Sequence, residues 1–472
     1  MGGLAVVLLF VTSCSEFETS ASDTPQGEEV ESPTNRPNIL FILTDDLDYA
    51  SVFKMPQIRS QLIEEGVSFE EAFVSYPVCC PSRATILTGL YAHNHNVRTN
   101  EPPEGGFQKF YSEGLEENTI AVRLQEGGYK TAFFGKYLNG YPGDEASTYI
   151  PPGWDEWYGK HRYREHQPYR YKINENGEVV SYDNNTEDYY TDVLSGQATD
   201  FVRRSAEDSR PFFMYVAPTA PHGPATPAER HKGAFAGEQA PRHPSFDEED
   251  VSDKPTYVSS LKRISEEEAS AIDDYYRKRL ESMLAVDEMV GSLIQELEAA
   301  GKLDNTYIFF TSDNGWEQGE HRLQKGKARP YEESVQVPLF VRGPGVAPNS
   351  TIEKLTLNTD FAPTFADLAS TEFPADGRSL APLLRGEDQP WRSVVLLEKL
   401  GKGAYEGVRT ETHKYVEYDN GKQELYDLET DPYELESLHE STNPSLLEDL
   451  KAKLDALKNC SKKGCQEAED VP

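Results

Sequence analysis

Four strand-like segments, each followed by polar residues, place the strongest constraint on what this chain can fold into. With the residues that follow them, they are 37–43 (Asp45, Asp46), 129–134 (Lys136), 211–216 (His222) and 307–310 (Asp313, Asn314). The first contains an unbroken apolar run, which is typical of a strand buried on both faces of a parallel sheet. Ligands of open α/β sheets bind beyond the carboxyl ends of the strands. We therefore expect these polar residues to lie together at one edge of a sheet.

Segments with the apolar spacing of helices lie between these strands. They are 118–128, 191–204 and 275–301, and the third has the most regular apolar stripe. Strands that alternate with helices predict an α/β fold, with a mostly parallel sheet flanked by helices on both faces. Residues 140–190, rich in Tyr, Gly and Asn, are predicted to be an irregular surface region. The proline-rich stretch 225–255 is predicted to be a lid on the substrate side rather than a packed element.

The character of the chain changes after about residue 385. Short strand-like segments at 394–397, 407–409 and 414–418 predict a small antiparallel sheet, and 444–457 predicts a closing helix. The expected organisation is a catalytic domain at 37–385 and a C-terminal subdomain at 386–472.

The net charge of the chain limits the classes of molecule that it can bind. Of its 472 residues, 46 are basic and 81 acidic, which gives a net charge of −35. Such a surface argues against binding to nucleic acid or to anionic membranes. It also repels a polyanionic glycan at long range, so an anionic substrate has to be held by local cations.

The N-terminus indicates export. An apolar run at 2–11 is too short to span a bilayer. It leads to Val11-Thr12-Ser13-Cys14, which resembles the lipobox of bacterial lipoproteins, with Cys14 as the lipid anchor; an ordinary secretory signal is the alternative. Residues 1–14 are thus expected to be a signal peptide, and the acidic stretch 15–36 a flexible tether.

A second constraint is the segment Cys79-Cys80-Pro81-Ser82-Arg83. Proline suits the first position of a helix, so Cys80 is predicted to be the cap residue and Cys79 to lie just outside the helix. A thiol there lies near the positive end of the helix dipole and beside the Arg83 cation, a place suited to anions. A capped helix start with two half-buried cysteines is the alternative interpretation.

This cysteine segment resembles the motif of the formylglycine-dependent sulfatases. The resemblance implies that Cys79 is oxidised to an aldehyde by a formylglycine-generating enzyme, and that the aldehyde hydrate is the nucleophile. It also implies an alkaline-phosphatase-like fold and one calcium ion. The calcium ligands of the family resemble, position for position, Asp45, Asp46, Asp313 and Asn314, with an oxygen from residue 79 completing the site.

The same resemblance assigns four further site residues. Lys327, four residues before a Tyr-Glu pair, matches the lysine that contacts the sulfate, and Lys136 and Arg83 supply further positive charge. His222 is a candidate proton donor to the leaving alkoxide, with Lys327 as the alternative, and Asp313 is a candidate base. Many members have a histidine where this chain has Leu138, so Asn139 or another residue has to replace it.

Several segments resemble the N-acetylglucosamine-6-sulfatase-like branch, among them 135–139, 244–246 and 424–428. This branch implies hydrolysis of a 6-O-sulfate on an amino sugar, although another sulfated polysaccharide or an aryl sulfate would fit the same core. Two alternatives are a phosphatase or phosphodiesterase of the alkaline phosphatase superfamily and an inactive lipoprotein that binds sulfated glycans.

Two cysteines remain near the C-terminus. Cys460 and Cys465 are plausible as a disulfide in an exported protein, and two free thiols are the alternative.

Overall fold

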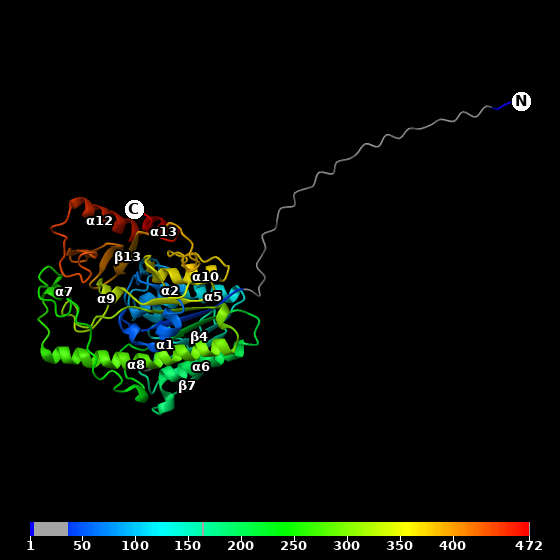
Figure 1. The fold of residues 1–472 in the computed structure, drawn as a ribbon, viewed down its shortest axis with the longest axis horizontal. Helices are drawn as coiled ribbons and strands as arrows, with labels where there is room; N and C mark the ends of the chain where they lie inside the picture. The colour runs from blue at the N-terminus through cyan, green and yellow to red at the C-terminus, as the bar shows by residue number, and fades with distance from the viewer. Residues whose placement is uncertain (4–35, 163–164, 472) are drawn as a thin grey trace.

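The computed structural model describes residues 1–3, 36–162 and 165–471. It contains a large sheet between helices, with a smaller sheet beside it (Figure 1). The strands of the large sheet are β1 (Asn38–Thr44), β2 (Val67–Phe69), β4 (Lys130–Gly135), β5 (Glu156–Lys160), β6 (Lys172–Glu175), β7 (Glu178–Ser181), β8 (Phe212–Ala217), β9 (Thr306–Ser312), β10 (Leu339–Arg342) and β11 (Ser350–Ile352). Their spatial order is β11-β2-β10-β9-β1-β8-β4-β5-β6-β7.

The centre of the large sheet is parallel. Strands β9, β1, β8, β4 and β5 run in one direction, whereas β10 joins β9, and β6 joins β5, in antiparallel pairing. The four strands predicted from the sequence, β1, β4, β8 and β9, all lie in this parallel centre. The prediction of an α/β fold with a mostly parallel sheet is confirmed.

Each face of the sheet packs against its own helices. Successive strand residues point to opposite faces; Ile39 and Phe41 of β1 belong to one buried cluster, and Leu40 and Ile42 to the other. The first face is covered by α2 (Cys79–Thr88), α4 (Gly106–Ser112), α5 (Ile120–Glu126), α10 (Phe361–Leu368) and α11 (Ala381–Leu384). The second is covered by α1 (Pro56–Ile58), α6 (Tyr190–Ser205) and α8 (Glu266–Ala299), with α6 and α8 along the lower side of Figure 1.

Short elements connect these layers. The helices are α3 (Ala92–His95), α7 (Thr256–Ser259) and α9 (Glu332–Val335), and β3 (Ala72–Phe73) pairs with β12 (Thr356–Leu357). Single turns are η1 (Ser51–Lys54), η2 (Arg59–Ile63), η3 (Leu115–Asn118), η4 (Thr186–Asp188), η5 (Glu229–His231), η6 (Leu303–Asn305) and η7 (Asn358–Asp360).

The longest helix, α8, begins earlier than predicted, at Glu266 rather than at residue 275. Its first turns are polar, so they carry no apolar periodicity. The start is set by a capping box, in which Ser265 Oγ accepts from the Glu268 N–H at 3.3 Å and the Glu268 carboxylate accepts from the Ser265 N–H at 2.8 Å.

Two sequence predictions about surface segments were wrong. Residues 140–190 are not irregular throughout, because β5, β6 and β7 extend the main sheet there. The stretch 225–255 packs against the body of the protein, with Ala240 and Val251 almost completely buried. Polar and proline-rich composition hid both features, because their burial depends on partners distant in sequence. A lid function for 225–255 stays a prediction.

The smaller sheet is antiparallel and follows the chain order. Its strands are β13 (Val394–Lys399), β14 (Tyr405–Thr410), β15 (His413–Tyr418) and β16 (Gln423–Asp427). Helix α12 (Pro444–Leu457) and helix α13 (Lys463–Glu469) follow it, and Leu450 and Leu454 of α12 share a buried cluster with the strands. The predicted sheet and closing helix are confirmed, and β16 and α13 are additions. The predicted boundary at 385/386 stays a prediction.

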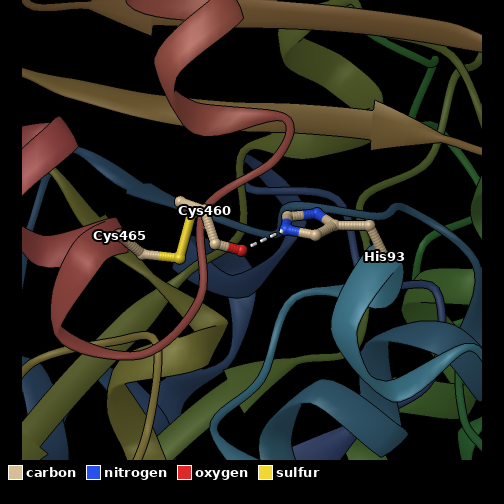
Figure 2. Close-up of side chains that lie close together, drawn as sticks. All are labelled: His93, Cys460 and Cys465. Carbon is tan, nitrogen blue, oxygen red and sulfur yellow. Dashed lines mark hydrogen bonds between the residues drawn. A yellow bond between two sulfur atoms is a disulfide. The ribbon is translucent and has the colours of Figure 1, made fainter.

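A disulfide joins Cys460 and Cys465, as one of the two interpretations of these cysteines predicted. His93, on helix α3, lies 3.0 Å through Nε2 from the Cys460 carbonyl oxygen, so the bridged loop rests against the catalytic part of the chain (Figure 2). Cys79 and Cys80 are free thiols and buried. The predicted signal peptide, Cys14 and the tether lie almost entirely outside the described residues.

Candidate active site

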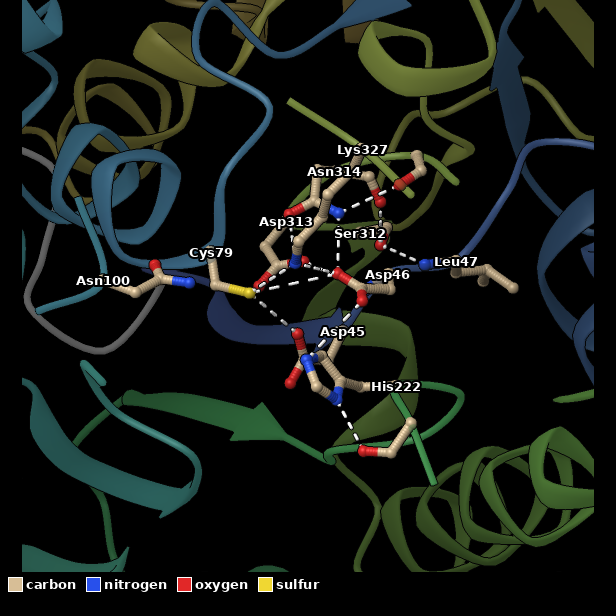
Figure 3. A network of polar contacts seen from close by, with 12 residues as sticks. Asp45, Asp46, Leu47, Cys79, Asn100, His222, Ser312, Asp313, Asn314 and Lys327 are labelled. Carbon is tan, nitrogen blue, oxygen red and sulfur yellow. Dashed lines mark hydrogen bonds and ion pairs between the residues drawn. The ribbon is translucent and has the colours of Figure 1, made fainter. Parts of the chain in front are cut away.

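The polar residues after the four central strands meet at one edge of the large sheet (Figure 3). Asp45 and Asp46 follow β1, Asp313 and Asn314 follow β9, and each of these side chains is almost completely buried. The Asp46 N–H donates to Asp313 Oδ1 at 3.1 Å, and Asn314 Nδ2 donates to Asp46 Oδ1 at 2.8 Å. The two strand ends therefore form one connected carboxylate cluster.

Cys79 reaches this cluster from the first turn of helix α2. Its sulfur lies 3.3 Å from Asp45 Oδ1 and 3.9 Å from Asp46 Oδ1, and its side chain is fully buried. The predicted helix start was wrong in register: Val78 is the cap residue, and Pro81 is the third residue of the helix instead of the first. This is tolerated because the first four N–H groups of a helix have no intrahelical acceptor.

Two lysines neutralise the cluster. Lys136, directly after β4, donates to Asp45 Oδ2 at 2.8 Å and is completely buried. Lys327 contacts Asp46 Oδ1, lies 2.7 Å from the Cys79 sulfur and 3.4 Å from Asn314 Oδ1. The structure thus brings Lys327, and not its neighbour Lys325, to the site.

Arg83 binds the cluster at Asp313 and at the backbone of Lys136. Its Nε donates to Asp313 Oδ2 at 2.8 Å and its Nη1 donates to the Lys136 carbonyl oxygen at 2.6 Å. Both the guanidinium and the Asp313 carboxylate are almost completely buried. Arg83 therefore ties α2 to the ends of two strands.

His222 lies after β8 at the open side of the site. Its Nε2 is 3.6 Å from Asp46 Oδ2, and its Nδ1 lies 2.7 Å from the Gly223 carbonyl oxygen. A carbonyl only accepts, so Nδ1 carries a proton and Nε2 faces the carboxylates. The side chain is 23% exposed, in contrast to the buried carboxylates.

Burial and neighbouring charge act against each other on the three carboxylates. Burial favours the neutral acid, but the neighbouring positive charges together, Lys136 foremost, outweigh it and hold the pKa of Asp45 well below its usual range. The pKa of Asp46 is also lowered, with Lys327 as the main cation that offsets burial. Burial, followed by the nearby charge of Asp45, raises the pKa of Asp313.

The cluster has the donor set of a cation site. One ligand atom from each of Asp45, Asp46, Cys79 and His222 lies within 4.8 Å of the others. Asp46 Oδ2 is buried and has no hydrogen-bond partner among the described residues. Such an oxygen costs free energy unless a donor or a cation satisfies it. Hard carboxylate and amide oxygens fit calcium better than softer metals.

Three residues around the site were not anticipated. Asn100 Oδ1 accepts from the Cys80 N–H at 2.8 Å, and Arg279 Nη2 donates to the Asp46 carbonyl oxygen at 2.5 Å. His166 Nε2 lies 3.1 Å from Lys136 Nζ. Arg279 did carry a signal, because it is a charged residue within the apolar stripe of α8. The loops that hold Asn100 and His166 offered none.

This fold and this site together define a class of protein. A family model described as Sulfatase matches residues 37–371, and one described as N-sulphoglucosamine sulphohydrolase, C-terminal, matches residues 319–460. The chain belongs to the sulfatase family and is a sulfuric ester hydrolase.

Particular members of the family resemble it over most of its length. Human N-acetylglucosamine-6-sulfatase is 34% identical over 479 residues, which cover 92% of this chain and 86% of that protein. The N-acetylglucosamine-6-O-sulfatase of Bacteroides thetaiotaomicron is 29% identical over 518 residues, which cover 92% and 86%. A putative extracellular sulfatase Sulf-1 homolog of Caenorhabditis elegans is 37% identical over 378 residues, which cover 77% and 52%.

A solved structure extends the likeness to three dimensions. It shows a protein in complex with its substrate, D-glucosamine-2-N,6-O-disulfate, and it matches this chain with a TM-score of 0.77 at 26% identity. The match covers 92% of this chain and 98% of that one. The predicted resemblance to sulfatases, and within them to the N-acetylglucosamine-6-sulfatase-like branch, is confirmed.

Proposed function

We propose that this sulfatase hydrolyses 6-O-sulfate esters of N-acetylglucosamine or a closely related amino sugar. The observation that carries the proposal is the convergence of Cys79 with the carboxylates of Asp45 and Asp46 and the ammonium groups of Lys136 and Lys327. The substrate class comes from the relatives, two of which are named for this activity. An aryl sulfate or another sulfated polysaccharide is the broader alternative.

The nucleophile in this proposal is formylglycine made from Cys79 by a formylglycine-generating enzyme. Burial, followed by the charge of Asp45, raises the pKa of the Cys79 thiol well above its usual value. The reactive form of cysteine is the thiolate, so the unmodified side chain is a poor nucleophile at this place. As the aldehyde hydrate, formylglycine would supply one hydroxyl to attack sulfur as the bond from sulfur to the sugar oxygen breaks, and a second hydroxyl whose deprotonation would release the sulfate.

One calcium ion completes the proposed site. Asp45, Asp46, Asp313, Asn314 and an oxygen of residue 79 would hold it. When bound, it neutralises negative charge on the sulfate and lowers the cost of forming a nucleophilic oxygen beside an anion. This role agrees with Asp46 Oδ2, which has no hydrogen-bond partner among the described residues, and with the carboxylate and amide oxygens of these side chains.

The remaining roles in the proposed reaction, charge stabilisation and proton transfer, fall to the charged side chains and to His222. Lys136, Lys327 and Arg83 offset the charge that builds up on the sulfate oxygens, in a buried setting where such interactions are strong. His222, the most exposed of the group, donates a proton to the sugar oxygen as it leaves, with Lys327 as the alternative donor. Asp313 is the proposed base for the attacking hydroxyl.

The relatives and the N-terminal sequence both support export as part of the proposal. One relative is named as an extracellular sulfatase. No helix among the described residues combines the length and the apolar character needed to cross a membrane. We propose that the chain is exported and either secreted or anchored to the cell envelope through Cys14.

The test is release of inorganic sulfate by the matured enzyme from N-acetylglucosamine-6-sulfate and from its 3- and 4-sulfated isomers. We expect turnover of the 6-sulfate, loss of turnover in Cys79→Ala, and retention in Cys80→Ala, a matched change of the neighbouring buried thiol. Equal rates on aryl phosphate and aryl sulfate would favour the phosphatase alternative. Binding without turnover by protein that retains the Cys79 thiol would favour the glycan-binding alternative.

A further inference from the structure

His166 lies in contact with two site residues although it belongs to a loop between β5 and β6. Its Nε2 is 3.1 Å from Lys136 Nζ. Its ring stacks on that of His222, with centroids 3.9 Å apart and planes inclined by 12°. Leu138, at the position where many sulfatases have histidine, is instead buried in the apolar core.

We propose that His166 is the positioning residue that compensates for the missing histidine at position 138. It holds the ammonium of Lys136 and the ring of His222 in their working orientations. The inference rests on the proposed function, since it assigns Lys136 to the sulfate and His222 to the leaving oxygen. Asn139, the candidate considered from the sequence, makes no side-chain hydrogen bond to either residue among the described contacts.

The protonation of the pair follows from geometry. Lys136 Nζ donates to the Asp45 carboxylate. Burial favours the neutral amine, but the neighbouring charges, with Asp45 first among them, raise the pKa of Lys136, so it is an ammonium, a group that only donates. His166 Nε2 must then accept, which places the ring proton on Nδ1. Burial and the neighbouring charge of Lys136 both lower the pKa of His166, in agreement with a neutral ring. A neutral ring fixes one N–H of Lys136 and presents a flat face to His222 without adding charge.

The loop around His166 is tied down on both sides. Glu165 accepts from the Gly140 N–H at 3.3 Å, and Lys160 Nζ donates to the Gln167 carbonyl oxygen at 2.9 Å. The Pro168 carbonyl accepts from the Tyr190 N–H at 3.0 Å. Lys160 is itself almost completely buried. These contacts fix the backbone, and with it the direction of the imidazole, as a positioning role requires.

Substitutions can separate the contact of His166 with Lys136 from its stacking on His222. His166→Gln keeps an acceptor for Lys136 but lacks the aromatic face, so it should misorient His222. We expect a fall in kcat on N-acetylglucosamine-6-sulfate, whose alkoxide needs a proton, and little change on nitrophenyl sulfate, whose phenolate leaves without one. His166→Phe keeps an aromatic ring that can stack on His222 but has no acceptor for Lys136, so it should lower kcat on both substrates. His166→Ala should lower both by up to about 100-fold.

Gln167→Ala is the matched control, because it changes a side chain of the same loop and leaves the carbonyl that binds Lys160 in place. Melting temperatures close to wild type in the Gln and Phe variants separate positioning from loss of fold. Wild-type protein that releases no sulfate refutes the proposed function itself. If the wild type is active, two results overturn this inference. One is a His166→Ala variant with the same rates as wild type, and the other is that His166→Gln and His166→Phe have the same rates as each other on both substrates.

Discussion

At the scale of single residues, each buried carboxylate of the site lies beside a cation, and the pKa values of Asp45 and Asp46 are lowered although burial acts against this. Asp45 has Lys136 and Asp313 has Arg83 at 2.8 Å, and Asp46 has Lys327 at its Oδ1. The other oxygen of Asp46, Oδ2, lies 3.6 Å from His222 Nε2 and has no hydrogen-bond partner among the described residues. Removing one partner of such a buried pair leaves a charge without compensation, which is more costly than never having the pair. Asp46 is therefore the residue at which a bound cation matters most.

We expect calcium to stabilise the fold through Asp46. Chelation should abolish sulfate release and lower the melting temperature, and added Ca2+ should restore both. At a calcium concentration one hundred times its dissociation constant, stabilisation is about 3 kcal/mol. Thermal unfolding with and without calcium measures this shift. Asp46→Asn should shrink the shift, whereas Asp304→Asn, at an exposed position, should keep it. An equal shift in Asp46→Asn and wild type would contradict the assignment.

A buried glutamate distant from the site predicts a pH effect on stability. Glu116 is 4% exposed, and burial raises its pKa from 4.5 to about 7, although Tyr149 donates to it at 2.8 Å. The folded state holds this proton more tightly than the unfolded chain does. Its contribution to stability is therefore complete below pH 4.5 and is lost as the pH rises through about 7.

Glu116→Gln should remove this dependence. We expect the free energy of unfolding of the variant to exceed that of wild type above pH 7, by up to about 3 kcal/mol, and the difference to shrink toward pH 4.5. Urea titrations across this pH range measure it. Glu117→Gln, a change of the exposed neighbour, should follow wild type. A variant that stays parallel to wild type at every pH would show that Glu116 is ionised throughout.

At the scale of elements, the sequence predicted the strands that build the site and missed those at the edge. Strand β1 was visible because it is buried on both faces and contains an unbroken apolar run. Strands β6 and β7 are short and partly exposed, so their pairing depends on β5 and not on their own composition. The site residues at strand ends were predictable for the same reason as the strands. His166 was not, because the direction of its loop is set by contacts with residues outside it, among them Gly140, Lys160 and Tyr190.

We expect the capping box of α8 to stabilise the first turns of this helix. Ser265→Ala removes the acceptor for the Glu268 N–H and should cost about 1 kcal/mol of stability. Faster hydrogen exchange should be confined to the first turns of the helix. Ser292→Ala, in the exposed middle of the same helix, should be neutral or slightly stabilising, because alanine is the better helix former. Equal losses in the two variants would mean that the cap contributes nothing.

At the scale of the whole molecule, an ion cluster joins the small sheet to helix α9. Lys414 of β15 lies 2.7 Å from Glu332 Oε1, at the start of α9, and 2.7 Å from Glu434 Oε1. The lysine side chain is completely buried, and Glu434 is almost so. Helix α9 directly follows the loop that carries Lys327, so this cluster connects the C-terminal sheet to the site.

Lys414→Met should therefore weaken the connection between the C-terminal sheet and helix α9. It leaves the buried Glu434 and the partly buried Glu332 without their shared cation, and we expect a loss of about 3 kcal/mol at neutral pH. Chemical denaturation measures the loss, and Lys422→Met, in the exposed hairpin turn of the same sheet, is the control. Adding Glu434→Gln to Lys414→Met should recover part of the loss. No difference between the Lys414 and Lys422 variants would contradict a coupling role.

The proposed mechanism requires residue 79 to act as formylglycine and not as a thiol. The most direct test compares preparations that differ in the converted fraction of Cys79, measured by peptide mass, with their rates of sulfate release from N-acetylglucosamine-6-sulfate. We expect a rate proportional to the converted fraction and a rate of zero for the pure thiol. A thiol-only preparation that releases sulfate at the full rate would contradict this mechanism.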